Sequence, residues 1–141
     1  RKAGKERMDD SYHFPETNLS AAVIRAAIAV HKALGPGSLE SFYDEALCLE
    51  LEGQQVPFER QKTFEVKYRG RVIGEHRLDL LVAGRLVVEL KTVQALDPIH
   101  FSIVRSYIKA LHIEAGLLLN FASMPLTIKR VGLHSACRGE P

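Results

Sequence analysis

The sequence predicts a single α/β domain in which helices flank a mixed sheet, and three observations lead to this expectation. The chain of 141 residues has the length of one domain with a hydrophobic core. Apolar residues recur at helical spacing over residues 20–52 and at the alternating spacing of strands from Val56 onward. A helix start at Asp97-Pro98 then precedes two further strands. The expected order is therefore two helices, about four strands, one helix and two strands (ααββββαββ).

The first two helices are predicted from caps and breakers. Ser20 is expected to cap a helix that runs to Leu34, where Gly35-Pro36-Gly37 ends it. Ser38 is expected to cap the second helix, which covers residues 39–52. The third helix should run from Asp97-Pro98 to about residue 111.

Strands are predicted where β-branched and aromatic residues alternate with polar ones. Arg69-Gly70 should form a turn, and the run Leu117-Leu118-Leu119 is typical of a strand covered on both faces. The expected strands lie around residue 58 and over residues 63–68, 71–76, 78–82, 85–91, 117–119 and 126–131.

Composition places the chain in a broad class. Residues 1–18 are expected to form a flexible basic arm, residues 19–134 the domain, and residues 135–141 a polar tail. The chain is 46% apolar and 26% charged, with a net charge of +2, which is ordinary for a globular protein. Cys48 and Cys137 show no metal spacing, and no apolar run reaches the ~20 residues of a membrane span. We therefore expect a cytoplasmic protein without a membrane partner.

The central hairpin, residues 77–91, carries Asp79, Glu89 and Lys91 between apolar residues. A two-residue turn at Ala83-Gly84 would pair Leu78 with Glu89 and set charge against the core. A three-residue connection pairs even positions with even ones and brings the three charged residues onto one face. We therefore predict a three-residue connection or an equivalent bulge, with Leu78 on the same apolar face as the other even positions.

Two carboxylates and an ammonium group on a partly buried face favour a divalent cation. Carboxylates a few Å apart do not both ionise cheaply without a cation, and oxygen ligands suit Mg²⁺ or Mn²⁺ better than zinc. Lys91 could then orient a water or stabilise negative charge on a transferring phosphoryl group. The spacing leaves open a simpler alternative, a solvated ion-pair cluster on an edge hairpin.

Two motifs in this order resemble a known family. Asp79 followed after nine residues by Glu89-Leu90-Lys91 resembles the motif of the PD-(D/E)XK nuclease superfamily. Residues 37–43 (GSLESFY) match the GxxExxY signature of one branch of that superfamily, and the likeness extends from about residue 19 to residue 133. The resemblance implies a restriction-endonuclease-like core and Mg²⁺-dependent cleavage of phosphodiester bonds in DNA, with RNA as the alternative substrate and Mn²⁺ as a substitute cation.

The resemblance also implies roles for individual residues. Asp79 and Glu89 would be catalytic and bind the metal, with the Leu90 carbonyl as a further ligand. Lys91 would position the attacking water or the transition state. Glu40 would contribute a catalytic and metal-binding acid from the second helix. An acid in the first turn of a helix is also favoured by the helix dipole alone, so a structural role for Glu40 stays open.

Nucleic acid is the expected partner, with DNA preferred over RNA. The strands before the hairpin have a basic bias that acids dilute at Glu59, Glu65 and Glu75. Tyr43 is alternatively a core aromatic whose hydroxyl finds a partner. A homodimer is expected only by analogy with nucleases that cut both strands. The candidate contacts are Arg60, Lys62, Arg77, Tyr43 and Tyr107.

Two other functions remain open at this point. Ile103 lies one turn before Tyr107, where relatives in this branch usually carry glutamine. This difference favours a nuclease-like domain that binds nucleic acid or a protein without cutting. In the third hypothesis the acids form a structural cluster in an interaction module.

Overall fold

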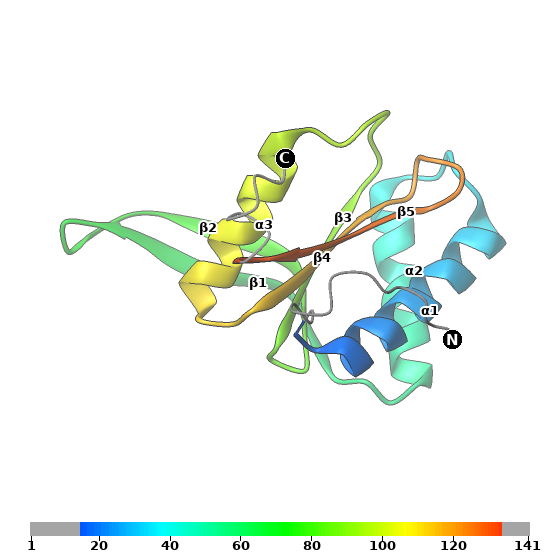
Figure 1. The fold of residues 1–141 in the computed structure, drawn as a ribbon, viewed down its shortest axis with the longest axis horizontal. Helices are drawn as coiled ribbons and strands as arrows, with labels where there is room; N and C mark the ends of the chain where they lie inside the picture. The colour runs from blue at the N-terminus through cyan, green and yellow to red at the C-terminus, as the bar shows by residue number, and fades with distance from the viewer. Residues whose placement is uncertain (1–14, 134–141) are drawn as a thin grey trace, which may run out of the picture.

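The computed structural model describes residues 15–133, which form a five-stranded mixed sheet with helices on both faces (Figure 1). The strands lie in the order β1-β2-β3-β4-β5; β3 and β4 are parallel and the other neighbours are antiparallel. None of the helices in this part of the chain is both long and apolar enough to cross a membrane. The elements are α1 (Thr17–Leu34), α2 (Glu40–Gly53), β1 (Phe58–Tyr68), β2 (Arg71–Val82), β3 (Leu86–Lys91), α3 (Pro98–Leu111), β4 (Ala115–Asn120) and β5 (Thr127–Gly132).

The predicted α/β fold class is confirmed, with one difference in the strand count. Residues 71–76 and 78–82, expected as separate strands, form the single strand β2, and the strands expected around residue 58 and over residues 63–68 form the single strand β1, so three strands precede α3. The described order is ααβββαββ. Of the arm expected over residues 1–18, residues 1–14 lie outside the described residues, whereas α1 already begins at Thr17. The tail expected at residues 135–141 also lies outside the described residues.

Two of the three predicted helix caps are wrong. α1 begins at Thr17, and Ser20 lies inside its first turn, where the hydroxyl donates to the Thr17 carbonyl at 3.0 Å. Leu39 occupies the N-cap position of α2 without a side-chain cap. The prediction at α3 is confirmed, because Pro98 is its first residue and Asp97 and His100 form a capping box.

Two apolar clusters cover the two faces of the sheet. One lies between the sheet and α1 and α2, and it includes Leu80, Val88, Leu90, Leu117 and Leu119. The other lies between the sheet and α3. β4 is buried along its whole length between them, as the continuous apolar run predicts.

The connection between β2 and β3 has three residues, as predicted. Val82 pairs with Leu86, which leaves residues 83–85 as the loop. Ala83 and Gly84 have φ of 54° and 68°, and the Arg85 amide donates to the Val82 carbonyl at 3.0 Å. Two consecutive left-handed residues turn the chain tightly, which sets the even-with-even register.

The alternation of β2 breaks at Asp79, and the predicted face of Leu78 is therefore wrong. Leu80 packs in the cluster against α1 and α2, whereas Leu78 packs in the cluster against α3. Gln61, opposite Asp79 in β1, has a left-handed φ of 52°, and regular pairing skips this position. Beyond this position β1 and β2 continue as a two-stranded ribbon that projects past α3 (Figure 1).

Candidate functional site

Asp79 and Glu89 bridge the point where β2 and β3 separate. The strand pairing ends at Leu80 and Val88. Beyond it, the Asp79 amide donates to Glu89 Oε1 at 2.7 Å, and the Leu90 amide donates to Asp79 Oδ2 at 2.8 Å. Each carboxyl group is therefore held by the opposite strand, in the place of a backbone ladder bond.

The two bridging acids have raised pKa values because they are poorly solvated. Glu89 is only 6% exposed, and burial followed by the charge of Asp79 raises its pKa to about 8. Burial also raises the pKa of Asp79, against the opposing effect of the hydrogen bond from Leu90. The ammonium of Lys91 lowers the pKa of both acids. The site therefore brings Asp79, Glu89 and Lys91 together as the motif spacing predicts.

Glu40 of α2 interacts electrostatically with Asp79 and Lys91. It is the first residue of the helix, and its pKa is raised by burial and then by the charge of Asp79. The charge of Lys91 lowers the same pKa. Glu40 thus lies within electrostatic range of Asp79 and Lys91. A solvated acid on an unrelated face of the protein would not lie within this range.

Asp44 belongs to the same group of acids, and sequence reasoning missed it. Asp44 lies one helical turn after Glu40 and is nearly buried, and its charge raises the pKa of Asp79. Arg60 pairs with Asp44 at 3.3 Å, and the Cys48 thiol donates to Asp44 Oδ1 at 3.4 Å. The sequence signal for Asp44 was its position next to the apolar residues Tyr43 and Leu47 on the buried side of α2, where an acid is unexpected.

The donor chemistry of the bridging pair fits a divalent cation. Carboxylate oxygens are the ligands that Mg²⁺ and Mn²⁺ prefer, and a cation would oppose the effects of burial and of the Asp79 charge that raise the pKa of Glu89. Within residues 15–133, no three acidic, histidine or cysteine side chains surround one point ready to hold a metal. The fit therefore rests on two carboxylates, with carbonyl oxygens and waters left to complete the coordination.

The basic residues predicted to contact nucleic acid are engaged to different degrees. Arg60 pairs with Glu45 at 3.1 Å as well as with Asp44, and Lys62 pairs with Glu59 at 3.2 Å. Arg77 is exposed, two residues before Asp79 on β2. Of the three cations, Arg77 alone lies beside the site without an ion-pair partner among the described residues.

Both predicted tyrosine contacts are buried, so neither side chain is presented to nucleic acid. Tyr43 is fully buried and stacks on Phe121 with ring centroids 4.6 Å apart. Its hydroxyl donates to the Gly35 carbonyl and accepts from the Ser38 amide. Ser38 lies one residue before Leu39, the N-cap of α2, and only its backbone amide takes part in this contact.

Tyr107 supports the site from α3. It is 6% exposed, and its hydroxyl donates to the Arg77 carbonyl at 3.2 Å. Burial, followed by the charges of Glu89 and Asp79, raises its pKa to about 12. Ile103, one turn earlier, packs partly buried against the same apolar cluster.

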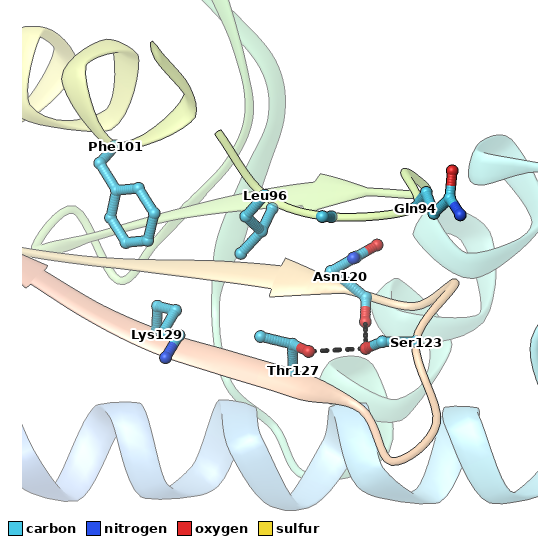
Figure 2. Close-up of a pocket in the computed structure, with 8 residues that line it drawn as sticks. Gln94, Leu96, Phe101, Asn120, Ser123, Thr127 and Lys129 are labelled. Carbon is cyan, nitrogen blue, oxygen red and sulfur yellow. Dashed lines mark hydrogen bonds between the residues drawn. The ribbon is translucent and has the colours of Figure 1, made fainter. Parts of the chain in front are cut away.

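A cavity of about 370 Å³ lies beside the site, at the ends of β3 and β4. Asn120 pairs with Lys91 on the adjacent parallel strand, and its amide holds the loop after β3 through Val93 at 2.8 and 3.1 Å. Figure 2 shows Phe101 and Leu96 across the cavity from Thr127 and Lys129 of β5. The sequence signal for this cavity was Asn120, the polar residue that ends the apolar run of β4. The lining residues are Gln94, Ala95, Leu96, Phe101, Asn120, Ser123, Thr127 and Lys129.

Comparison with known proteins gives the family of this chain. Its fold is similar to the solved structure titled "Crystal structure of SSO0001", with a TM-score of 0.53 and 18% sequence identity. That likeness covers 83% of this chain and 58% of the other, so this chain spans less than two thirds of its length. No curated protein matches. The family model described as "PD-(D/E)XK nuclease superfamily" matches residues 17–131, and the chain therefore belongs to this superfamily.

Proposed function

We propose that this chain is a Mg²⁺-dependent nuclease that hydrolyses phosphodiester bonds in DNA, and that it belongs to the GxxExxY branch of its superfamily. The observation that carries the proposal is the buried Asp79–Glu89 bridge beside Lys91, at the point where β2 and β3 separate. A pair of poorly solvated carboxyl groups that repel each other is costly, and the cost is offset when a cation binds between them.

Asp79 and Glu89 would hold the cation, with the Leu90 carbonyl and Glu40 as the further ligands that family likeness implies. When bound, the cation would neutralise the scissile phosphate and lower the pKa of a coordinated water. The remaining chemistry belongs to the chain. Lys91 extends from the same strand as Glu89, where its ammonium group would donate to a phosphate oxygen or to the attacking water.

Asp44 and Arg60 would act as positioning residues behind the ligands. Arg60 pairs with Asp44 at 3.3 Å and partly neutralises its charge. Without this ion pair, the full charge of Asp44 would raise the pKa of Asp79 further.

Metal-dependent cleavage by purified protein tests this proposal. Linear and supercoiled DNA are incubated with Mg²⁺, Mn²⁺ or EDTA, and single-stranded RNA is tested in parallel. Asp79→Asn and Lys91→Ala should each reduce cleavage by at least about 100-fold. Lys32→Ala, on the exposed face of α1, is the matched control for the loss of a lysine. Cleavage that survives both site substitutions would come from a contaminant and would refute the proposal.

A second function is favoured by one observation, the apolar packing of Ile103. This side chain contributes no polar group to the site, which suits a domain that binds nucleic acid without cutting it. Ile103→Gln separates the two functions, because an added amide should raise a weak cleavage rate if the site turns over. Mg²⁺-independent DNA binding without cleavage by either protein would favour the second function.

A further inference from the structure

β1 and β2 continue beyond Asp79 as a two-stranded arm, whose outer end projects past α3 (Figure 1). We call residues 66–74 the arm tip. Its strands pair up to Tyr68 and Arg71, and Arg69-Gly70 forms the turn with φ of 53° and 80°. Ile73 is the extra residue of a bulge, which increases the local twist of the ribbon.

The arm tip combines three cations with exposed apolar side chains. Lys67, Arg69 and Arg71 lie within it, and residues 66–74 contain no acid. Within the described part of the chain, none of the three side chains forms an ion pair. The apolar side chains are Tyr68, Val72 and Ile73, which are 64%, 52% and 66% exposed. Such a surface is suited to a polyanion that also offers apolar contacts.

Acids mark where this basic surface ends. Glu65 and Glu75 pair opposite each other, directly below the arm tip. A phosphate backbone would be repelled there, so the contact is confined to the tip itself. The cations and apolar groups of the arm tip are thus separated by these acids from Arg77, which lies nearer the site.

The arm and the candidate active site are parts of one strand. Arg71 lies eight residues before Asp79 on β2, which corresponds to about 26 Å at ~3.3 Å per residue. DNA rises ~3.4 Å per base pair, so this distance corresponds to about eight base pairs of duplex. A duplex with its scissile phosphate at Asp79 can therefore extend to the arm tip.

We propose that the arm tip enters the major groove of duplex DNA about eight base pairs from the bond that is cleaved. This inference rests on the proposed nuclease function and specifies its substrate. A two-stranded ribbon fits the major groove of DNA, whereas the major groove of duplex RNA is too deep and narrow for side chains. Lys67, Arg69 and Arg71 contact phosphates, and the apolar groups contact base edges such as thymine methyls.

The test variant removes the three charges and keeps the turn. It combines Lys67→Gln, Arg69→Asn and Arg71→Gln; asparagine before glycine suits the left-handed φ at position 69. The control variant combines Arg25→Gln, Lys32→Gln and Lys109→Gln, which removes the same net charge from exposed positions on α1 and α3. Circular dichroism and thermal unfolding establish that both variants fold.

Binding is measured without catalysis, by fluorescence anisotropy of a 30-base-pair DNA duplex in EDTA over a range of salt concentrations. The arm variant should lose about tenfold or more in affinity at 0.1 M salt, and its log–log salt slope should fall by up to about 2.7, or ~0.9 for each lost phosphate contact. The control variant should stay within about twofold of the wild type. A 30-base-pair RNA duplex should bind the wild type more weakly than DNA and lose less in the arm variant.

The outcomes separate this inference from the proposed function. Equal affinity and salt slope in wild type and arm variant would overturn it, as would an equal loss for RNA duplex or single-stranded DNA. Analytical ultracentrifugation gives a further outcome. If the wild type were a dimer and the arm variant a monomer with unchanged DNA binding, the tip would be a protein interface and the inference would be overturned. Wild-type hydrolysis of bis(p-nitrophenyl) phosphate tests the nuclease function separately, because that molecule is too small to reach the tip.

Discussion

The two halves of β2 belong to one strand and have opposite surroundings. The inner half, residues 78–82, pairs with β1 on one side and, over residues 80–82, with β3 on the other, and it is almost entirely buried. The outer half, residues 71–77, pairs with β1 alone and is exposed along its length. Asp79 lies at the junction, where the amides of separating strands need new acceptors. The two acids therefore lie where the backbone hydrogen bonds between β2 and β3 end, and their carboxyl groups accept from the amides left without a strand partner.

The largest difference in stability should follow from shortening one side chain in each half. Leu80→Ala leaves a cavity in the cluster against α1 and α2 and should cost about 3 kcal/mol of unfolding free energy. Val72→Ala, at a 52% exposed position of the outer half, should change it by less than about 0.5 kcal/mol. Urea unfolding measures both, and similar costs would mean that the arm is packed as tightly as the core.

The junction itself should respond to pH when no divalent cation is present. The folded-state pKa of Glu89 is about 8, above its ordinary 4.5, so the folded protein keeps a proton that the unfolded chain has lost. This contribution is fully present below about pH 4.5 and is lost as pH rises through about 8.

Glu89→Gln should remove this pH dependence, an effect on the order of 2 kcal/mol. Unfolding in EDTA at pH 5 and pH 8.5 measures it, and added Mg²⁺ should restore stability at pH 8.5 in the wild type alone. Unfolding curves of wild type and variant that shift in parallel with pH would show that Glu89 is ionised throughout.

Two glycines, one in the buried strand β4 and one in the outer half of β2, provide a matched pair of substitutions. A Cβ at Gly116 in β4 would lie 2.7 Å from Val104 Cγ1 and 3.2 Å from Ile108 Cδ1, where α3 approaches the sheet closely. Gly116→Ala should therefore cost roughly 1 to 2 kcal/mol. Gly74→Ala in the outer half meets nothing within 4 Å and should be close to neutral by thermal unfolding. A neutral Gly116→Ala would contradict the close approach of α3.

The smallest effect is expected at the turn of the arm. Arg69 adopts a left-handed φ of 53°, which asparagine tolerates better than arginine. Arg69→Asn should stabilise the hairpin by roughly 0.5 kcal/mol. Amide hydrogen exchange in β1 and β2 detects this local change, since global unfolding responds little to it. Faster exchange in the variant would contradict the turn conformation.

Local sequence signals predicted much of the fold and the central acids. The three-residue connection followed from parity, because only one register keeps Asp79 and Glu89 out of the apolar face. The change of face between Leu78 and Leu80 could not be predicted in this way. It depends on a left-handed φ at Gln61, a residue type that gives no signal for that conformation.

The parts of the site that come from α2 were harder to predict because they depend on tertiary packing. Tyr43 stacks in the core on Phe121, a residue far away in sequence, and is therefore not exposed for contact with nucleic acid. Asp44 belongs to the site through its electrostatic effect on Asp79 of β2, and it pairs with Arg60 of β1. Neither contact leaves a periodic pattern in the sequence, so neither could be read before the elements were assembled.

The two hydrogen bonds that bridge β2 and β3 require only a side-chain oxygen that accepts from a backbone amide. The side chains of asparagine and glutamine also carry such an oxygen. Asp79→Asn and Glu89→Gln each exchange a single oxygen for an NH₂ group and leave an acceptor for the Leu90 and Asp79 amides. Architecture and chemistry are therefore separable at this site. Under the proposed function, either substitution would remove a cation-binding charge and leave the folded scaffold in place.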